Sequence, residues 1–322
     1  PSTGKKIAVV GGGPSGLSSA YYLQLMGHQV TVYEMLPKLG GMLRYGIPNY
    51  RFPRERLQED IDTILSTGVE VKLNTRVGNG EGEISYNKLH EEYDAVYIAI
   101  GAHTDKKIGI EGEDANGVMS AVEMLRRIGD DDMPDFKDKT VVVVGGGNVA
   151  MDAARTALRL GAEVHVIYRR SEAELPARAE EVHHAKEEGI IFDLLTNPVE
   201  ILTDDKDWVT GIRCIRMELG EPDASGRRRP VEIEGSEYDI EVDTVIMSLG
   251  TSPNPLISST TKGLDVNRRK CIVADEENGQ TSKEGVFAGG DAVTGAATVI
   301  LAMGAGKAGA KGIDEYLKNK EK

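Results

Sequence analysis

Two stretches of this sequence decide the fold: Ile7–Glu34 reads IAVVGGGPSGLSSAYYLQLMGHQVTVYE, and Val141–Tyr168 reads VVVVGGGNVAMDAARTALRLGAEVHVIY. Each copy is a short apolar run, a glycine turn, a helix-like segment of about a dozen residues and a second apolar run. Short, continuous apolar runs that alternate with helices indicate parallel strands buried on both faces. The repeat therefore predicts two strand–turn–helix–strand units in an α/β protein.

The glycine spacing predicts what each turn holds. In this context the first glycine makes the tight turn and the second lets backbone N–H groups approach a pyrophosphate at the helix N-terminus. The third lets the helix and the strand pack closely. These positions are Gly11, Gly13 and Gly16 in the first copy, and Gly145, Gly147 and Ala150 in the second. An ordinary turn without a ligand is the alternative.

The residue that ends the second strand distinguishes the two predicted sites. In the first copy it is Glu34, whose carboxylate can accept hydrogen bonds from ribose hydroxyls and would repel a 2′-phosphate. In the second copy it is Tyr168, followed by Arg169 and Arg170. Two guanidinium groups can hold a 2′-phosphate, which favours NADP over NAD. A solvated strand end is the alternative, and Arg178 could join the pair.

A third motif lies near the C-terminus, where residues 285–291 read GVFAGGD. This is a short apolar strand that ends in Gly-Gly-Asp, and a helix is predicted from about Thr298 to Leu317. Asp291 can hold the ribityl hydroxyls of a flavin, and the helix N-terminus can face the flavin N1–C2=O edge. A plain helix cap is the alternative role for Asp291. Two nucleotide sites in one chain imply hydride exchange between a nicotinamide and a flavin.

Composition excludes several other classes of protein. The net charge of −14 over 322 residues argues against binding to nucleic acid or to an anionic membrane. The two cysteines, Cys214 and Cys271, form neither a CxxC redox pair nor a four-cysteine iron–sulfur site. The neighbouring His183 and His184 are interpreted as a solvated helical face, so no metal ligand is predicted. We expect a soluble, cytoplasmic protein.

Several further motifs carry a family resemblance. They are GGMLRYGIP (residues 40–48), YIAIGA (97–102), GGGNVAMD (145–152), YRR (168–170), LPARAEE (175–181) and AGGDAVTGAATV (288–299). Together with Gly11–Gly16 and Glu34 they resemble the two-dinucleotide-binding-domain flavoproteins, in particular the small (β) subunit of NADPH-dependent glutamate synthase. The same module occurs in dihydropyrimidine dehydrogenase and in the large subunit of electron-bifurcating ferredoxin–NADP oxidoreductase. The resemblance covers nearly the whole chain and is specific for the module, not for its physiological partner.

The resemblance implies an α/β architecture of two Rossmann-like, three-layer dinucleotide-binding domains, with the NADPH domain inserted into the FAD domain. We expect the FAD domain at residues 1–103 and 250–322, and the NADPH domain at 104–249. The residues expected to bind FAD are Gly11, Gly13, Pro14, Ser15, Gly16, Glu34, Met35, Gly41, Leu43, Gly46, Ile47, Ile100, Gly101, Gly250, Gly290, Asp291, Thr298 and Val299. Those expected to bind NADP(H) are Gly145, Gly147, Asn148, Val149, Ala150, Arg169 and Arg170. Arg44, in the glycine loop, is expected at the surface, and a contact with the pyrophosphate is the alternative.

The expected activity is hydride movement between NADP(H) and FAD, with electrons passed on to a partner. By resemblance the partner is a glutamate synthase large subunit or an iron–sulfur acceptor. We nominate no catalytic side chain, because hydride transfer depends on the placement of the two rings and needs no acid or base. Full-length relatives carry an N-terminal cysteine-rich domain with [4Fe–4S] clusters. Since this sequence starts at the first flavin strand, we expect that this domain was removed or that the clusters lie on another chain. A non-catalytic subunit of a redox complex and a flavin monooxygenase or oxidase are the alternatives.

Overall fold

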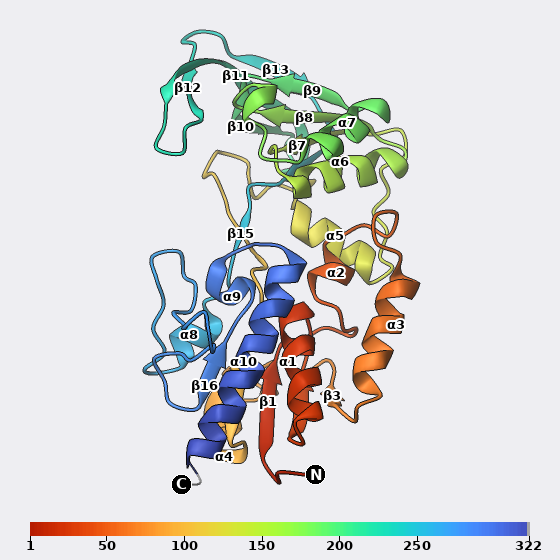
Figure 1. Ribbon diagram of the computed structural model, residues 1–322. Coiled ribbons are helices and arrows are strands. Elements are labelled where there is room, and N and C mark those ends of the chain that lie inside the picture. Colours follow the sequence, from red (N-terminus) through yellow and green to blue (C-terminus); the bar gives the residue numbers. More distant parts are fainter. Residues whose placement is uncertain (321–322) are drawn as a thin grey trace. The chain divides into compact units, whose positions relative to one another are not determined.

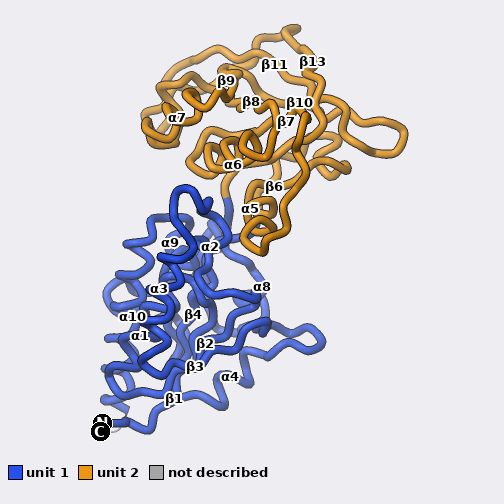
Figure 2. The backbone as a smooth tube through the Cα atoms, turned by 90° about the vertical axis from the view of Figure 1, so that its right-hand side faces the viewer, with its two compact units in different colours: residues 1–104, 251–322 blue, residues 105–250 orange. Residues whose placement is uncertain are grey.

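The chain forms two compact units in a computed structural model that describes residues 1–320 (Figures 1 and 2). Unit 1 contains Pro1–Thr104 and the chain from Thr251 onward, and unit 2 is Asp105–Gly250. One unit thus interrupts the other, and each join lies one residue from the boundary expected from the sequence. The short strands β5 (Thr104–Asp105) and β15 (Thr251–Ser252) lie at the two joins.

Unit 1 is built on a parallel five-stranded sheet in the order β16-β4-β1-β2-β3. Its strands are β1 (Lys6–Val10), β2 (Gln29–Tyr33), β3 (Glu70–Lys72), β4 (Ala95–Ile98) and β16 (Val286–Ala288). The first and last strands in sequence lie in the same sheet, on either side of β4. Strand β4 is fully buried along its length because helices cover both faces.

Each face of this sheet has its own core. On one face α1 (Pro14–Leu25), α3 (Arg54–Leu65) and α10 (Val299–Lys320) pack on the side chains of Ile7 and Val9. On the other face Ala8 and Val10 pack in a cluster with residues of α4 (Tyr86–Glu92), α8 (Leu256–Thr260) and α9 (Asp291–Thr294). Alternate residues of one apolar strand therefore serve opposite layers, which explains why the strand has no polar side.

Unit 2 repeats this plan with one face changed. Its parallel sheet has the order β6-β14-β7-β8-β9. The strands are β6 (Val118–Ser120), β7 (Thr140–Val144), β8 (Glu163–Tyr168), β9 (Ile191–Leu194) and β14 (Thr244–Met247). One face is covered by α5 (Ala121–Gly129), α6 (Asn148–Arg159) and α7 (Ala179–Glu187).

The other face of unit 2 packs on an antiparallel sheet. This sheet contains β10 (Thr196–Thr203), β11 (Val209–Pro222), β12 (Arg228–Glu232) and β13 (Tyr238–Glu241). Its buried side chains, such as Ile212 and Cys214, share a core with Val142 and Val144 of β7. Apolar and polar residues alternate in the sequence between Pro198 and Asp243, a pattern that predicts a small antiparallel excursion from the parallel fold, and the antiparallel pairs of β10, β11, β12 and β13 confirm it. The three-layer α/β class expected for both units is confirmed as well.

Two local details complete the picture. The glycine loop at residues 40–48, expected to be irregular, contains the one-turn helix α2 (Met42–Tyr45). A 3₁₀ turn, η1 (Glu172–Glu174), links β8 to α7. Within residues 1–320, no helix is both long and apolar enough to cross a membrane.

The two copies of the turn allow a matched test of packing. A Cβ added at Gly16 would lie 2.0 Å from the Gly11 carbonyl oxygen, whereas Ala150, at the equivalent place, is accommodated and fully buried. Gly16→Ala should therefore destabilise unit 1 by more than about 2 kcal/mol. The reverse change, Ala150→Gly, should cost only about 1 kcal/mol, through helix propensity. Urea unfolding of the cofactor-free chain measures both, and a Gly16→Ala variant as stable as the wild type would show that the close approach is misjudged.

Candidate cofactor sites

In the first glycine turn, two glycines are required by the protein's own backbone. Gly11 follows β1 with φ of +109°, and a Cβ there would lie 2.1 Å from the Ala99 carbonyl oxygen. At Gly16 an added Cβ would collide with the Gly11 carbonyl oxygen. A side chain at either position would collide with backbone, so packing alone explains both glycines.

Gly13 is different, because nothing in the protein requires a glycine there. Its φ is −82°, which any residue adopts, and the nearest atom to an added Cβ would be the Gly41 Cα at 3.6 Å. Gly13 is also the N-cap of α1, and no side chain caps that helix. Uncapped N–H groups and an open space beside them form a cradle for an anion. The turn therefore fits the pyrophosphate of a dinucleotide.

The second turn reproduces both properties. Gly145 has φ of +139°, and a Cβ there would lie 2.1 Å from the Ser248 carbonyl oxygen. Gly147 has φ of −87°, and no atom lies within 4 Å of an added Cβ. It is the N-cap of α6, which also starts without a side-chain cap. Each unit thus has one glycine that the fold itself does not require. A phosphate bound at the helix N-terminus would require it.

Glu34 is fixed at the end of β2, beside the first turn. Its Oε2 accepts a hydrogen bond from the Gly12 N–H at 2.8 Å, and its Oε1 accepts one from the Leu36 N–H at 2.8 Å. Burial raises the pKa of Glu34, and these main-chain donors oppose that rise. The carboxyl group is therefore held against the turn by main-chain hydrogen bonds.

The equivalent position in unit 2 has no carboxylate. The ring of Tyr168 lies against Gly146, where an added Cβ would be 2.7 Å from its Cδ2 atom, and the hydroxyl donates to the Glu174 carbonyl oxygen at 2.9 Å. The next residue, Arg169, is exposed, and its side chain has no hydrogen-bond or ion-pair partner among residues 1–320. A guanidinium with no internal partner is available to an anionic ligand.

Arg170 behaves differently from its neighbour. Its side chain is only 6% exposed, and its Nη2 lies 2.7 Å from Asp223 Oδ2, in the turn between β11 and β12. Its Nε is buried without a hydrogen-bond partner. Hydrogen bonds from Ser225, and then the contact with Arg170, hold the pKa of Asp223 below its ordinary value. Sequence reasoning treated the two arginines alike and missed Asp223, because that partner lies 53 residues further along the chain.

The C-terminal motif meets the first turn inside unit 1. Gly290 has φ of +71°, and a Cβ there would lie 2.8 Å from Ser15 Cβ. The Ser15 hydroxyl is hydrogen-bonded to the Tyr97 hydroxyl at 2.8 Å, which orients the serine side chain toward β4. Asp291 follows, and its Oδ1 accepts a hydrogen bond from the Ala297 N–H at 3.2 Å. Burial raises the pKa of Asp291 to about 6.

The glycine loop closes over the first turn. The Gly40 N–H donates to the Gly12 carbonyl oxygen at 2.9 Å, and a Cβ at Gly41 would lie 2.7 Å from Gly13 Cα. The expectation of a surface position for Arg44 is wrong. Arg44 is 8% exposed, and it donates to the Leu39 carbonyl oxygen and to Gln58 Oε1. Buried carbonyl oxygens need donors, and this arginine supplies them.

Arg54 was missed by the sequence analysis altogether. It is the first residue of α3, and its guanidinium donates to the carbonyl oxygens of Leu43, Arg44 and Ile47. Burial, and then the neighbouring Arg44, lower the pKa of Arg54. Two arginines thus fix the loop that carries Gly41, Leu43, Gly46 and Ile47.

The remaining expected site residues lie at the ends of the same strands and helices. Ile100 and Gly101 follow β4, and Gly250 follows β14; Met35 follows Glu34, Thr298 precedes α10, and Val149 lies in the first turn of α6. Their contact with a cofactor stays a prediction.

The cysteines take no part in either turn. Cys214 lies in β11 and Cys271 in unit 1, and both are free and buried. Burial raises the pKa of Cys214 to about 12. His183 lies on the exposed face of α7, with its Nε2 3.1 Å from Glu187 Oε1. Over residues 1–320 there is no group of three or more side chains arranged to hold a metal ion.

From the raised pKa of Asp291 we predict that the free energy of unfolding of the cofactor-free chain depends on pH. The folded chain keeps a proton up to about pH 6 that the unfolded chain releases near pH 4. The contribution of this group is therefore most favourable below about pH 4, falls between about pH 4 and 6, and stays low above that range. Asp291→Asn should stabilise the cofactor-free chain at pH 7.5 by on the order of 1–2 kcal/mol after solvent screening, and the gain should vanish toward pH 4.

Urea unfolding across this pH range measures the effect. The matched control is Asp275→Asn, an exposed carboxyl that also accepts a main-chain hydrogen bond. A gain that is equal at pH 4 and pH 7.5, or a loss at pH 7.5, would contradict the assigned protonation.

Comparison with known proteins identifies the family of the chain. The family model described as pyridine nucleotide-disulphide oxidoreductase matches residues 5–306. A glutamate synthase [NADPH] small chain of Escherichia coli is 36% identical over 98% of this chain and 69% of its own length. The NADP(+)-dependent formate dehydrogenase subunit beta of Moorella thermoacetica is 47% identical over 98% of this chain and 44% of its own length.

The structure comparison shows the fold. FprA from Mycobacterium tuberculosis superposes with a TM-score of 0.84 at 21% identity, covering 99% of this chain and 86% of that one. The chain spans about half the length of the first curated relatives that it matches. By its match to the family model over most of its length, the chain belongs to the pyridine nucleotide-disulphide oxidoreductases, and it is similar to the small chain of glutamate synthase.

Proposed function

We propose that unit 1 binds FAD, that unit 2 binds NADP(H), and that the chain moves a hydride between them before electrons pass to a partner. The observation that carries this proposal is the pair of optional glycines, Gly13 and Gly147. In both turns the fold leaves a space in front of an uncapped helix N-terminus. A pyrophosphate in each space explains both glycines with one cause.

The residues that follow β2 and β8 support the assignment of FAD to unit 1 and of NADP(H) to unit 2. The Glu34 carboxylate can accept hydrogen bonds from ribose hydroxyl groups and would repel a 2′-phosphate, and both properties suit the adenosine of FAD. The exposed, unpaired Arg169 suits the 2′-phosphate of NADP(H). Arg170 is paired with Asp223, and its buried Nε–H has no hydrogen-bond partner among the described residues.

The chain's own residues would position the flavin and stabilise the negative charge that it gains on reduction. When bound, the flavin supplies the acceptor for the hydride. Arg44 and Arg54 hold the Gly40–Gly46 loop, which would lie beside the flavin. Asp291, when ionised, would accept hydrogen bonds from the ribityl hydroxyl groups. The N-terminus of α10 presents positive N–H dipoles to negative charge. No side chain needs to transfer a proton for this step, so the chain's contribution is placement and electrostatics.

We infer that the electron acceptor lies outside this chain. A dithiol route is not supported, because the chain's only cysteines are buried, and one lies in each unit. Matched relatives are named as beta subunits of a formate dehydrogenase and of an NADPH-Fe(3+) oxidoreductase, and as a small chain of glutamate synthase. A partner subunit or iron–sulfur domain is the corresponding acceptor here, in the cytoplasm.

Anaerobic titration tests the proposal. The purified chain should carry a flavin spectrum that bleaches on addition of NADPH. Arg169→Ala should weaken NADPH binding about tenfold or more, the loss of a hydrogen bond to a charged group, and leave NADH unchanged. The matched control is Arg229→Ala, an exposed arginine of β12.

Each alternative gives a different result. Absence of flavin, or flavin that neither nucleotide bleaches, would refute an active oxidoreductase and leave a non-catalytic binding subunit. Rapid reoxidation by oxygen with an oxygenated product would favour a monooxygenase. Equal loss of NADPH and NADH binding in Arg169→Ala would refute the assignment of the 2′-phosphate.

A further inference from the structure

A short hairpin in unit 1 carries three consecutive cations at its tip. Its two arms meet at the antiparallel bridge between Val266 and Ile272, and residues 268–270, which read RRK, form the tip. Asn267 fixes the turn, because its Oδ1 accepts hydrogen bonds from two main-chain N–H groups of the hairpin, at 2.9 and 3.1 Å. The three cationic side chains therefore start from a backbone that is already ordered.

The charges of the 268–270 tip are not neutralised within the chain. Arg268, Arg269 and Lys270 are exposed, and none of their side chains has a hydrogen-bond, ion-pair or aromatic partner among residues 1–320. The acidic residues nearest to the tip in sequence, Asp265 and Asp275, form no ion pair with it in the described part of the chain. Three unpaired positive charges thus lie together on a chain whose net charge is −14.

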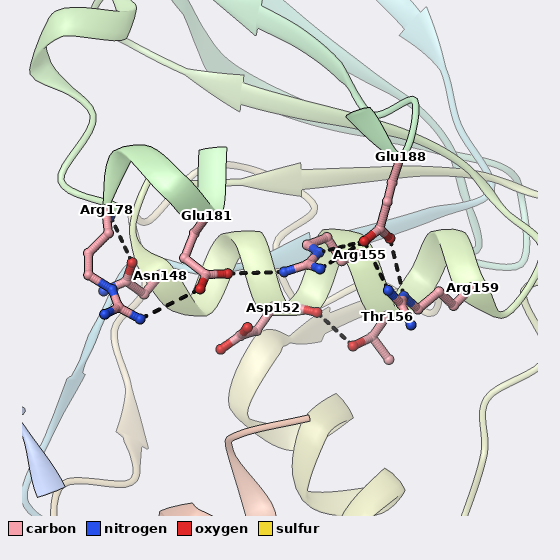
Figure 3. Close-up of polar contacts among 8 residues, drawn as sticks. All are labelled: Asn148, Asp152, Arg155, Thr156, Arg159, Arg178, Glu181 and Glu188. Atoms are coloured by element: carbon pink, nitrogen blue, oxygen red, sulfur yellow. Dashed lines mark hydrogen bonds and ion pairs between the residues drawn. The ribbon is translucent and has the colours of Figure 1, made fainter. Parts of the chain in front are cut away.

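Other groups of arginines in the described residues are engaged. On α6, Arg155 Nη1 lies 3.0 Å from Glu181 Oε2. Arg159 Nη2 lies 2.9 Å from Glu188 Oε1, and Figure 3 shows both pairs. In the run Arg227–Arg229 of unit 2, the first two guanidinium groups donate to a hydroxyl and to main-chain carbonyl oxygens of their own hairpin. The 268–270 tip differs from these groups because all three of its cations are available to a partner.

The hairpin is attached to the part of unit 1 that is proposed to face the flavin. The Ile272 N–H donates to the carbonyl oxygen of Ala292, the residue after Asp291, at 2.8 Å. A Cβ added at Gly295 would lie 4.0 Å from Cys271 Sγ, so the same arm also lies beside the end of α9. A protein that binds at this hairpin would therefore contact unit 1 on the side of Asp291.

Exposed apolar side chains accompany the cations. Val266 is 42% exposed and Val273 is 47% exposed, and each lies on one arm of the hairpin. Protein interfaces combine an apolar centre with a polar rim, and complementary charges across the rim raise the rate of association. A surface that carries carboxylates around an apolar patch matches this hairpin, and a basic surface would be repelled by it.

We propose that the 268–270 tip is the docking point of the electron-transfer partner, and that this partner is an iron–sulfur protein or domain with an acidic face. The inference rests on the proposed function, because it locates where the partner of that reaction binds. The net charge of −14 would repel an acidic partner on average. A local cluster of unpaired cations attracts such a partner to one place and excludes basic proteins from it.

Electron exchange with an acidic plant-type [2Fe–2S] ferredoxin of low potential tests the proposal. Two reduced ferredoxins give one electron each, through the FAD-loaded chain, to NADP⁺, which takes up one proton to form NADPH. The triple variant Arg268→Gln, Arg269→Gln and Lys270→Asn should raise the ferredoxin KM about tenfold at low salt and leave kcat unchanged. Asparagine is chosen at Lys270 because it tolerates the φ of +64° there.

Salt and a matched variant separate docking from net charge. The loss should disappear at roughly 0.5 M NaCl, where exposed charges are screened. The control is Arg227→Gln, Arg228→Gln and Arg229→Gln, which removes the same charge from unit 2 and should change the ferredoxin KM by less than about twofold. Equal losses in the two triple variants, or a loss that persists at high salt, would overturn the proposal.

The valines give a second, salt-independent test. Val266→Ser combined with Val273→Ser should raise the Kd for oxidised ferredoxin several-fold at both salt concentrations, because apolar contacts are not screened. Unchanged binding in this variant would remove the apolar part of the proposed surface. Thermal melting of each variant checks that the exposed substitutions leave the fold intact.

The direct binding measurement also distinguishes the two levels of the argument. The wild-type chain should bind oxidised ferredoxin more tightly than cytochrome c, a basic one-electron carrier. Absence of ferredoxin binding at low salt, or tighter binding of cytochrome c, would overturn the docking proposal even if NADPH bleaches the flavin. Flavin that NADPH does not bleach would instead refute the proposed function. Menadione, a small uncharged acceptor, should be reduced by NADPH at the same rate in every variant, and a loss there would show that the tip acts on the flavin site and not on docking.

Discussion

A helix that begins directly after a strand, without a side-chain cap, leaves main-chain N–H groups that must find an acceptor. Helices α1 and α6 both begin in this way, behind the two copies of the glycine turn, and the two candidate sites are built around them. In each unit the helix starts at the carboxyl end of an apolar parallel strand, and a tight glycine turn sets its direction. A second glycine, without a side chain, leaves room in front of the helix N-terminus. A diphosphate satisfies all of these conditions at once.

The same scaffold acquires different preferences through the residues that end the second strand. Glu34 is fastened by the Gly12 and Leu36 N–H groups, so its negative charge is fixed beside the first turn. In the other unit an aromatic ring takes that place, and the charge that follows is positive. On the proposed assignment, a difference of a few side chains at one point of a repeated fold separates a site that excludes a 2′-phosphate from one that attracts it.

Sequence reasoning reached the features that local pattern determines. The glycine repeat, the buried strands and the antiparallel excursion follow from spacing and alternation, because neighbouring residues decide them. It could not reach contacts made by long side chains across the fold. Arg44 was expected at the surface, but it donates to the Leu39 carbonyl oxygen. Arg170 and Ser15 were expected to bind cofactors, and their side-chain partners within the fold, Asp223 and Tyr97, were not foreseen. Arg54 gave no signal, since its role is to bind carbonyl oxygens that the loop presents only when folded.

The most direct test of the central claim is the cofactor content of two matched variants, Gly13→Val and Gly147→Val. Both positions have ordinary backbone angles, and a Cβ would meet only an ordinary van der Waals contact at Gly13 and no atom within 4 Å at Gly147, so both variants should fold. The account predicts that the first loses FAD and still binds NADPH, and that the second keeps FAD and loses NADPH. Full retention of both cofactors by either variant, or the reverse pairing, would contradict it.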